Sequence, residues 1–236
     1  ALIELGQWSD AAALVPVSAV PTNYQFLLTF DVTTQDNDFY QLNTNRAGYT
    51  VGDSVDITGL LANTMPFASA KDPRLPVSNT KTLGEDGATP LVLQSVYARD
   101  DPVPLVSGID ARLTEAEARL NAQDIGGMTA ILNALRTTAQ TIGIYKVPVM
   151  AALPTPTTQA QAVAVFLRES AFWQFGRGYR LQNLRRMVRL NGYTQDQVFP
   201  TGTFFKGGVY GTDVNFPVFN NELTNPNFHG CLDRKA

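Results

Sequence analysis

Cysteine and histidine are nearly absent from the sequence, which has one of each in 236 residues, Cys231 and His229. A single cysteine cannot form a disulfide within the chain, and it excludes a zinc site made of several cysteines. A single histidine excludes a histidine-rich metal site and leaves one candidate base for a Ser-His-Asp mechanism. We therefore expect no metal centre and no cofactor.

A strong charge of either sign is also absent. Eighteen Lys and Arg residues face 21 Asp and Glu residues, a net charge of −3. This balance argues against bulk attraction to nucleic acid or to an anionic membrane. No stretch approaches the roughly 20 apolar residues of a membrane-spanning helix. Hydrophobic residues make up 44% of the chain, enough to bury a sizeable core.

The clearest pattern in the sequence is helical and covers residues 107–142. Two apolar stripes follow the spacing of a helix, one at Ile109, Leu113, Ala116 and Leu120 and the other at Met128, Ile131, Leu132 and Leu135. Ser107 and Asp110 form a capping box before the first stripe, with Asp in place of the usual Glu or Gln. The pattern predicts a helical hairpin.

The rest of the chain divides by composition into four further segments. Residues 1–20 have the features of the end of a helical repeat, with Gly6 at a left-handed helix end. Because a domain rarely begins inside a helix, we expect the chain to be the C-terminal part of a longer protein. Proline and glycine punctuate residues 21–106, which predicts loops and short strands. Residues 157–190 form a long Arg-rich helix or a helix pair, and residues 191–236 an irregular tail.

Four blocks of the sequence resemble one known family. They are residues 72–75 (Asp-Pro-Arg-Leu), residues 107–118 running into 131–136, residues 166–173 continuing through 178–186, and a closing segment with Phe216, Pro217, Val218, Glu222 and Asn225 to Asn227. In this order they resemble the SusD/RagB-like outer-membrane proteins. Ser170, Tyr179 and Asn183 depart from the residues usual in that family, which are Arg, His and Asp.

The resemblance implies a fold, a location and a function. The expected fold is mainly α, with TPR-like helical hairpins, a large irregular, loop-rich part and a few short strands, and residues 1–236 are expected to be the C-terminal portion of a single SusD-like domain. The expected protein is a surface-exposed outer-membrane lipoprotein whose anchor lies before residue 1. It is not an enzyme: it caps a TonB-dependent, SusC-like transporter and delivers an oligosaccharide or similar nutrient to it.

Residue chemistry adds a candidate ligand site to this expectation. Sugar binding needs aromatic faces and amide or carboxylate hydrogen bonds. One predicted loop supplies that mixture, with Asn37, Phe39, Tyr40, Asn43 and Tyr49. The alternative is that these aromatic side chains pack beneath the loop. Asp36 and Asp38 lie beside them and offer two ligands to a calcium ion, although the glycine and glutamate of an EF-hand loop are missing.

Two other classes of function compete with nutrient binding. A TPR-type scaffold would bind proteins and no small molecule. A carbohydrate-active hydrolase would need two carboxylates facing each other across a groove, and Glu115 and Glu117, two residues apart on a helix, do not share a face. We expect one of these two to face solvent and the other to pair with an arginine.

Overall fold

A computed structural model describes residues 1–56, 59–210, 214–215 and 220–229. These residues form two compact units. Unit 1 contains residues 1–53 and 65–179, and unit 2 contains residues 54–64 and 180–236. No helix of the described residues is long and apolar enough to cross a membrane.

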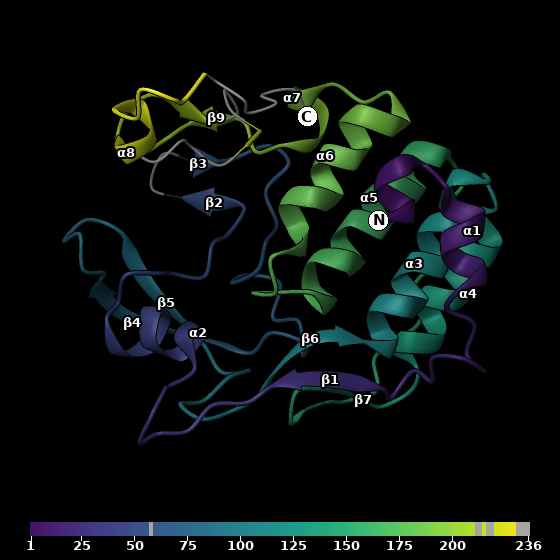
Figure 1. Cartoon of the computed structure of the whole chain (residues 1–236), viewed down its shortest axis with the longest axis horizontal. Helices are drawn as coiled ribbons and strands as arrows, with labels where there is room; N and C mark the ends of the chain where they lie inside the picture. The colour runs from purple at the N-terminus through teal and green to yellow at the C-terminus, as the bar shows by residue number, and fades with distance from the viewer. Residues whose placement is uncertain (57–58, 211–213, 216–219, 230–236) are drawn as a thin grey trace. The chain divides into compact units, whose positions relative to one another are not determined.

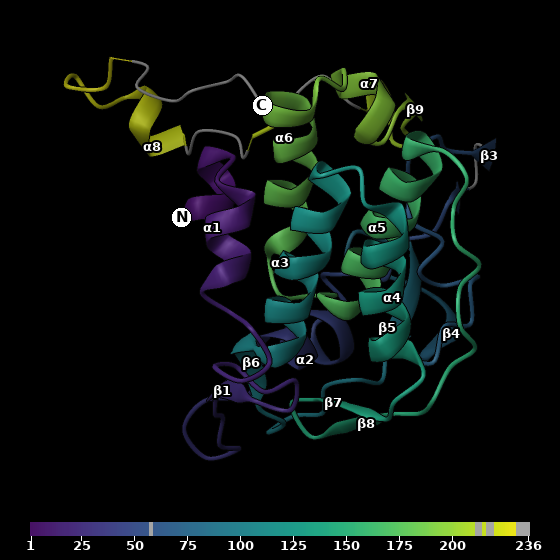
Figure 2. The ribbon, with the colours of Figure 1, turned by 90° about the vertical axis from the view of Figure 1, so that its right-hand side faces the viewer.

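Unit 1 contains a group of adjacent helices. The helices are α1 (Trp8–Ala13), α3 (Gly108–Asn121), α4 (Ile125–Arg136) and α5 (Gln159–Trp173). Helix α3 contacts each of the other three, and α4 also contacts α5 (Figures 1 and 2). A short 3-10 helix, η1 (Leu2–Leu5), precedes α1 and ends at Gly6, whose φ of 74° confirms the predicted left-handed position.

The predicted helical hairpin is confirmed as α3 and α4. The first apolar stripe is at most 3% exposed at each of its four residues, and it packs inside unit 1. The capping box is also present, since the Ser107 hydroxyl accepts from the Asp110 backbone N–H and the Asp110 carboxylate accepts from Ser107 N–H. The hairpin ends earlier than predicted, at Arg136, because residues 140–142 form a strand.

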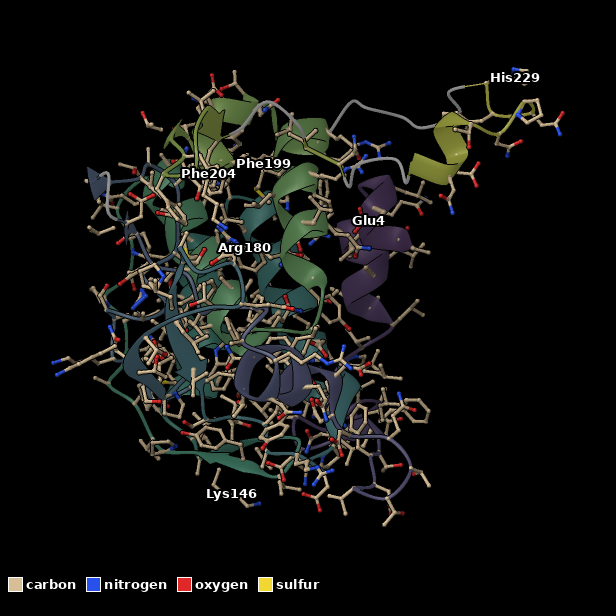
Figure 3. All side chains as sticks on the ribbon, turned by 90° about the vertical axis from the view of Figure 1, so that its left-hand side faces the viewer. Glu4, Lys146, Arg180, Phe199, Phe204 and His229 are labelled. Atoms are coloured by element: carbon tan, nitrogen blue, oxygen red, sulfur yellow. The ribbon has the colours of Figure 1, made fainter. Side chains whose placement is uncertain are left out.

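Three two-stranded antiparallel sheets complete unit 1. They pair β1 (Gln25–Leu28) with β6 (Val103–Ser107), β4 (Val77–Leu83) with β5 (Pro90–Gln94), and β7 (Gln140–Ile142) with β8 (Tyr145–Val147). In β1–β6, Phe26 lies opposite Val106, and the register shifts after this pair. On β8, Lys146 points away from the ribbon (Figure 3).

The expectation of a mainly α fold is wrong. Of the described residues, 36% are helical and 18% lie in strands or bridges of small antiparallel sheets, which makes the chain mixed α/β. Much of the difference comes from residues 21–106, where the sequence predicted mostly loops with a few short strands. Proline and glycine exclude long helices there, but they leave room for short strands whose partners are distant in the sequence, as in β1 and β6.

Unit 2 is built from short elements around one longer helix. The elements are β2 (Val55–Asp56), β3 (Gly59–Leu60), α6 (Tyr179–Asn191), α7 (Gln195–Val198), β9 (Gly202–Thr203), β10 (Val209–Tyr210) and α8 (Asn220–Leu223). Strand β2 pairs with β3, and β9 with β10. Phe199 is buried, and Phe204 contacts Phe205 and Tyr210 edge to face near the β9–β10 hairpin (Figure 3).

The Arg-rich stretch at residues 157–190 is a helix pair, α5 and α6, rather than one helix. The break falls at Gly176 and Gly178, whose φ angles are 72° and 79°. A Cβ added to Gly176 would lie 2.5 Å from the Phe39 ring, so the break also admits a close contact. Residues 216–218 of the closing resemblance block, and Cys231, lie outside the described residues.

Candidate functional site

Two of the resemblance blocks meet at a buried arginine in unit 1. Arg74 is 1% exposed and donates to both oxygens of Glu169 on α5, at 2.6 and 3.0 Å. It also donates to both oxygens of Asp72, at 2.8 and 2.7 Å. Its guanidinium lies 5.0 Å from the ring centroids of Phe172 and of Trp173. Two charge-assisted hydrogen bonds to Glu169 thereby fix the Asp-Pro-Arg block to α5, and two more hold Arg74 to Asp72 within the block.

The network around Arg74 has more positive than negative members. Arg136, from α4, donates to Glu169 at 3.0 Å, and Arg168 lies 3.8 Å from Asp72. Burial alone would raise the pKa of Asp72, but the hydrogen bonds and charge of Arg74 outweigh burial and lower it. Burial would lower the pKa of Arg74, but its two carboxylate partners outweigh burial and raise it. Asp72 and Arg74 are therefore both held in their ionised forms near neutral pH.

The predicted ligand loop folds into α2 (Asp38–Tyr40) and a π-helix, η2 (Gln41–Asn45). Asn37 is fully buried, accepts from the N–H groups of Phe39 and Tyr40, and donates to Asp101 O. Asn43 is also fully buried and donates to Tyr49 O and Val92 O. Both amides hold the loop together and are shielded from any ligand in this conformation.

The aromatic side chains of the loop are in contact with one another. Phe39 packs edge to face on Tyr49, Tyr97 and Phe175, with ring centroids 5.3–5.8 Å apart. Burial raises the pKa of Tyr49, although 38% of this residue remains exposed. The structure therefore buries Asn37 and Asn43 and packs Phe39 against three other rings, which for Phe39 is the packing that the alternative expected. Tyr40 and Tyr49 keep partly exposed side chains, and their role as ligand contacts stays a prediction.

The outer face of the same loop forms a polar hollow of about 280 Å³. Polar or charged side chains line it, among them Thr33, Asp36, Asp38, Gln41 and Arg46. Arg99, from a distant part of the sequence, also lines it. We call this the polar hollow. It is lined by neighbours of the predicted residues, because side chains of a helix at i+1 point away from those at i. A π-helix, which η2 supplies here, is a form often found at functional sites.

The polar hollow presents both donors and acceptors. Arg99 donates to Asp36 at 2.8 Å, and this hydrogen bond raises the pKa of Arg99. Gln41 donates to the second Asp36 oxygen, which leaves Asp36 engaged on both sides. The side chains of Asp38 and Arg46 make no hydrogen bond or ion pair with another described residue. A ligand with several hydroxyl groups matches such a mixture, because each hydroxyl both donates and accepts.

A second cavity lies beside the Asp-Pro-Arg block. It has a volume of about 560 Å³, within the range of small-molecule sites. Its polar lining is Asp53, Ser69, Lys71, Asp72 and Asn79, and its apolar lining includes Pro73, Leu75 and Val92. We call this the Asp-Pro-Arg cleft. The sequence shows residues 72–75 as a block of the resemblance and gives no sign of the cleft, since the walls of the cleft come from segments up to about 40 residues apart.

The described residues also bear on the two alternative chemistries, a metal site and a hydrolase. Among the described residues, no three His, Cys, Asp or Glu side chains gather as a metal ligand set, and Asp36 is engaged by Arg99 and Gln41. Glu115 lies 3.3 Å from Arg112, as expected of one member of the acidic pair. The expectation that the other faces solvent is wrong, because Glu117 is 2% exposed.

Comparison of the chain with models of protein families, with curated proteins and with solved structures finds no match.

Proposed function

We propose that the chain is a non-catalytic nutrient-binding protein of the SusD/RagB-like kind. In this role it captures an oligosaccharide or a similar hydroxyl-rich nutrient at the surface of an outer membrane. It then passes the ligand to a TonB-dependent, SusC-like transporter that it caps. No bond of the ligand is made or broken.

The observation that carries the proposal is the contact between Arg74 and Glu169. These residues belong to two blocks that resemble the family, and 95 positions separate them in the sequence. Separate chance matches would have no reason to meet in the fold. Here the two blocks share a buried ionic network, which supports a common scaffold behind both resemblances. In unit 2, Arg186 donates to Asn183 at 2.7 Å, so the amide replaces the family's carboxylate as the acceptor.

The polar hollow supports a sugar-like ligand for this scaffold. It offers the carboxylate of Asp38, the guanidinium of Arg46 and threonine hydroxyls on one open surface. Tyr49, whose side chain is partly exposed, belongs to the same loop and supplies an aromatic ring. Hydrogen bonds with hydroxyls and contact with an aromatic face are the interactions that sugar recognition uses.

A second candidate function, a protein-binding scaffold without a small-molecule ligand, is favoured by one observation. Five apolar side chains on or beside the β1–β6 sheet are each about half exposed, namely Tyr24, Phe26, Leu28, Leu105 and Val106. Contiguous exposed apolar surface marks interaction sites. Binding of an oligosaccharide in the absence of any transporter separates the two functions.

The experiment that tests the proposal is affinity electrophoresis of the purified chain through gels that contain neutral plant or microbial polysaccharides. We expect retardation by at least one polysaccharide and no release of reducing ends on incubation. Arg46→Gln should weaken the retardation, because it removes a hydrogen-bond donor of the polar hollow. The matched control is Arg119→Gln, since Arg119 is a solvent-exposed arginine on α3, outside the hollow.

Two results would contradict the proposal. Release of reducing ends by the wild-type chain would show catalysis. Equal retardation of wild type and Arg46→Gln would remove the hollow as the site.

The partner is tested separately, by co-expressing the chain with the TonB-dependent transporter encoded beside it and purifying the transporter. A genomic neighbourhood without such a transporter would exclude the capping role.

A further inference from the structure

The Asp-Pro-Arg cleft has one rigid wall and one apolar wall. Asp72 and Leu75 are buried, and the Arg74 network fixes their backbone to α5. The opposite wall is the face of the β4–β5 sheet where Asn79 lies across from Val92. At one end, Ser69 donates to Asp53 at 2.8 Å. A cleft held by such elements keeps its shape without a ligand, as a binding site requires.

Within this cleft, Lys71 is the charged side chain whose hydrogen-bond donors are not used by another described residue. Asp72 already accepts from the backbone N–H and from two guanidinium nitrogens of Arg74. Asp53 accepts from Ser69. Lys71 is exposed and makes no hydrogen bond or ion pair with another described residue. An entering ligand therefore meets an ammonium group whose three donors are available.

The charges around the cleft add up to an excess of one positive charge. Lys71, Arg74, Arg136 and Arg168 carry four positive charges, and Asp53, Asp72 and Glu169 carry three negative ones. The chain as a whole carries a net charge of −3. The lining itself holds Lys71, Asp53 and Asp72, and the arginine-rich network behind Asp72 offsets these two carboxylates, which permits an anionic ligand beside Lys71.

Lys71 has a strained backbone conformation. Lys71 follows the turn at residues 66–70 and takes a φ of 50°, a left-handed conformation that glycine adopts without strain. A lysine there destabilises the fold relative to glycine. Strained residues of this kind concentrate at functional sites. Lys81 has a similar φ of 59°, but it lies at a register shift in the β4–β5 pairing, which accounts for its conformation.

We infer that the Asp-Pro-Arg cleft binds a small ligand that carries a carboxylate, with the Lys71 ammonium as the anion-binding group. Ser69 and Asn79 offer hydrogen bonds to hydroxyl groups of the same ligand, and Pro73 and Val92 contact its apolar face. An acidic sugar such as a uronate has this combination of a carboxylate, hydroxyls and C–H faces. The site is separate from the polar hollow and does not rest on the transporter function.

The test compares digalacturonate with its dimethyl ester, in which two methyl groups remove the negative charges, by isothermal titration calorimetry on the whole chain. We expect the wild-type chain to bind the acid more tightly than the ester. Lys71→Gln should weaken binding of the acid about tenfold, a change of about 1.4 kcal/mol in binding free energy, and leave the ester unaffected. On this variant the two ligands should bind alike, and added salt should weaken the acid only on wild type.

A glycine variant separates a binding defect from a folding defect. Lys71→Gly removes the ammonium group and relieves the left-handed strain, so its thermal midpoint should equal or exceed that of wild type while the preference for the acid is lost. Lys81→Gln is the matched control, because it removes a lysine of similar backbone conformation outside the cleft. It should bind digalacturonate as wild type does.

Each contrary outcome overturns the inference. Equal affinity of wild type for the ester and the acid would show that the carboxylate is not recognised. Equal weakening of acid binding by Lys81→Gln and Lys71→Gln would indicate attraction to any surface lysine. If Arg46→Gln weakens the acid and Lys71→Gln does not, the anion binds in the polar hollow. The neutral polysaccharide assay tests the proposed function independently of all three results.

Discussion

Asn43 shows at the residue scale how a side chain suited to ligand binding serves folding. It is fully buried, donates to two carbonyl oxygens and accepts from Gln94 N–H at 2.9 Å. Its amide thus joins the π-helix to strand β5. A sequence shows that an asparagine lies in a loop, but it does not show which face of the loop is covered.

We predict that Asn43→Ala lowers the free energy of unfolding by about 2–4 kcal/mol, because one buried and two partly buried backbone groups lose a hydrogen bond. Urea denaturation measures the change. Asn45→Ala is the control, since Asn45 is exposed and makes one side-chain hydrogen bond, to Gln41. Its effect should stay within about 0.5 kcal/mol. Equal effects of the two substitutions would contradict the structural role of Asn43.

Asp72 gives a prediction about pH, also at the residue scale. Its pKa in the folded protein is lowered, because Arg74 outweighs the effect of burial. The stabilisation that the Asp72 carboxylate gives to the folded state is therefore present at pH values above its unfolded pKa of about 3.9. It is lost as the pH falls through the lower pKa of the folded protein. Asp31 also has a lowered pKa, from its hydrogen bonds with Thr33, so a comparison with a variant is needed.

We predict that Asp72→Asn is less stable than wild type near neutral pH and that the difference shrinks as the pH falls below about 4. Urea denaturation of both proteins over this pH range measures the difference, and the contribution of Asp31 cancels from it. A difference that does not change with pH would show that the Asp72 carboxylate contributes no charge interaction to folding.

At the scale of elements, the start of α3 has a double function. Ser107 and Asp110 cap the helix, and Asp110 also accepts from Arg177, whose side chain is 2% exposed, and from Gln174. The sequence contained the cap in full, because its two residues are three positions apart. It did not contain the bond to Arg177, which is 67 positions away.

We predict that Ser107→Ala costs about 1 kcal/mol of stability, the usual value of a helix cap. Asp110→Ala should cost about 3 kcal/mol or more, because it leaves the buried guanidinium of Arg177 without its carboxylate. Thermal or urea denaturation measures both, with Ser9→Ala, an exposed position on α1, as the control. Equal losses for the two α3 variants would mean that the Arg177 pair adds nothing.

At the scale of the whole molecule, the division into two units has a measurable consequence. Both tryptophans, Trp8 and Trp173, belong to unit 1, and α6 is the longest helix of unit 2. Most of the buried apolar residues of the described chain also belong to unit 1. Tryptophan fluorescence therefore reports on unit 1, while far-ultraviolet circular dichroism reports on both.

We predict that the circular dichroism signal begins to fall at a lower urea concentration than the tryptophan fluorescence, because the smaller core of unit 2 is less stable. Parallel measurement of the two signals on the same samples tests this expectation. Coincident transitions would show that the units unfold together as one cooperative structure.

Local patterns in the sequence determined the longer helices of this protein, α3, α4, α5 and α6. The stripes at 109–120 and 128–135, the cap at Ser107 and the break at Gly176 and Gly178 all depend on residues within one or two helical turns of each other. The sequence also placed Asp72, Arg74 and Glu169 in separate blocks of one resemblance. Interactions of short range are visible in a sequence because the spacing itself encodes them.

Tertiary structure alone decided the mixed α/β class, the buried faces of the ligand loop and the two cavities. Strand β1 finds its partner about 80 residues away, and Arg74 finds Glu169 at a separation of 95 positions. The same folding turned Asn37 and Asn43 inward and left Asp38, Arg46 and Lys71 at the surface. Such contacts depend on how the whole chain packs, and no periodicity in the sequence records them.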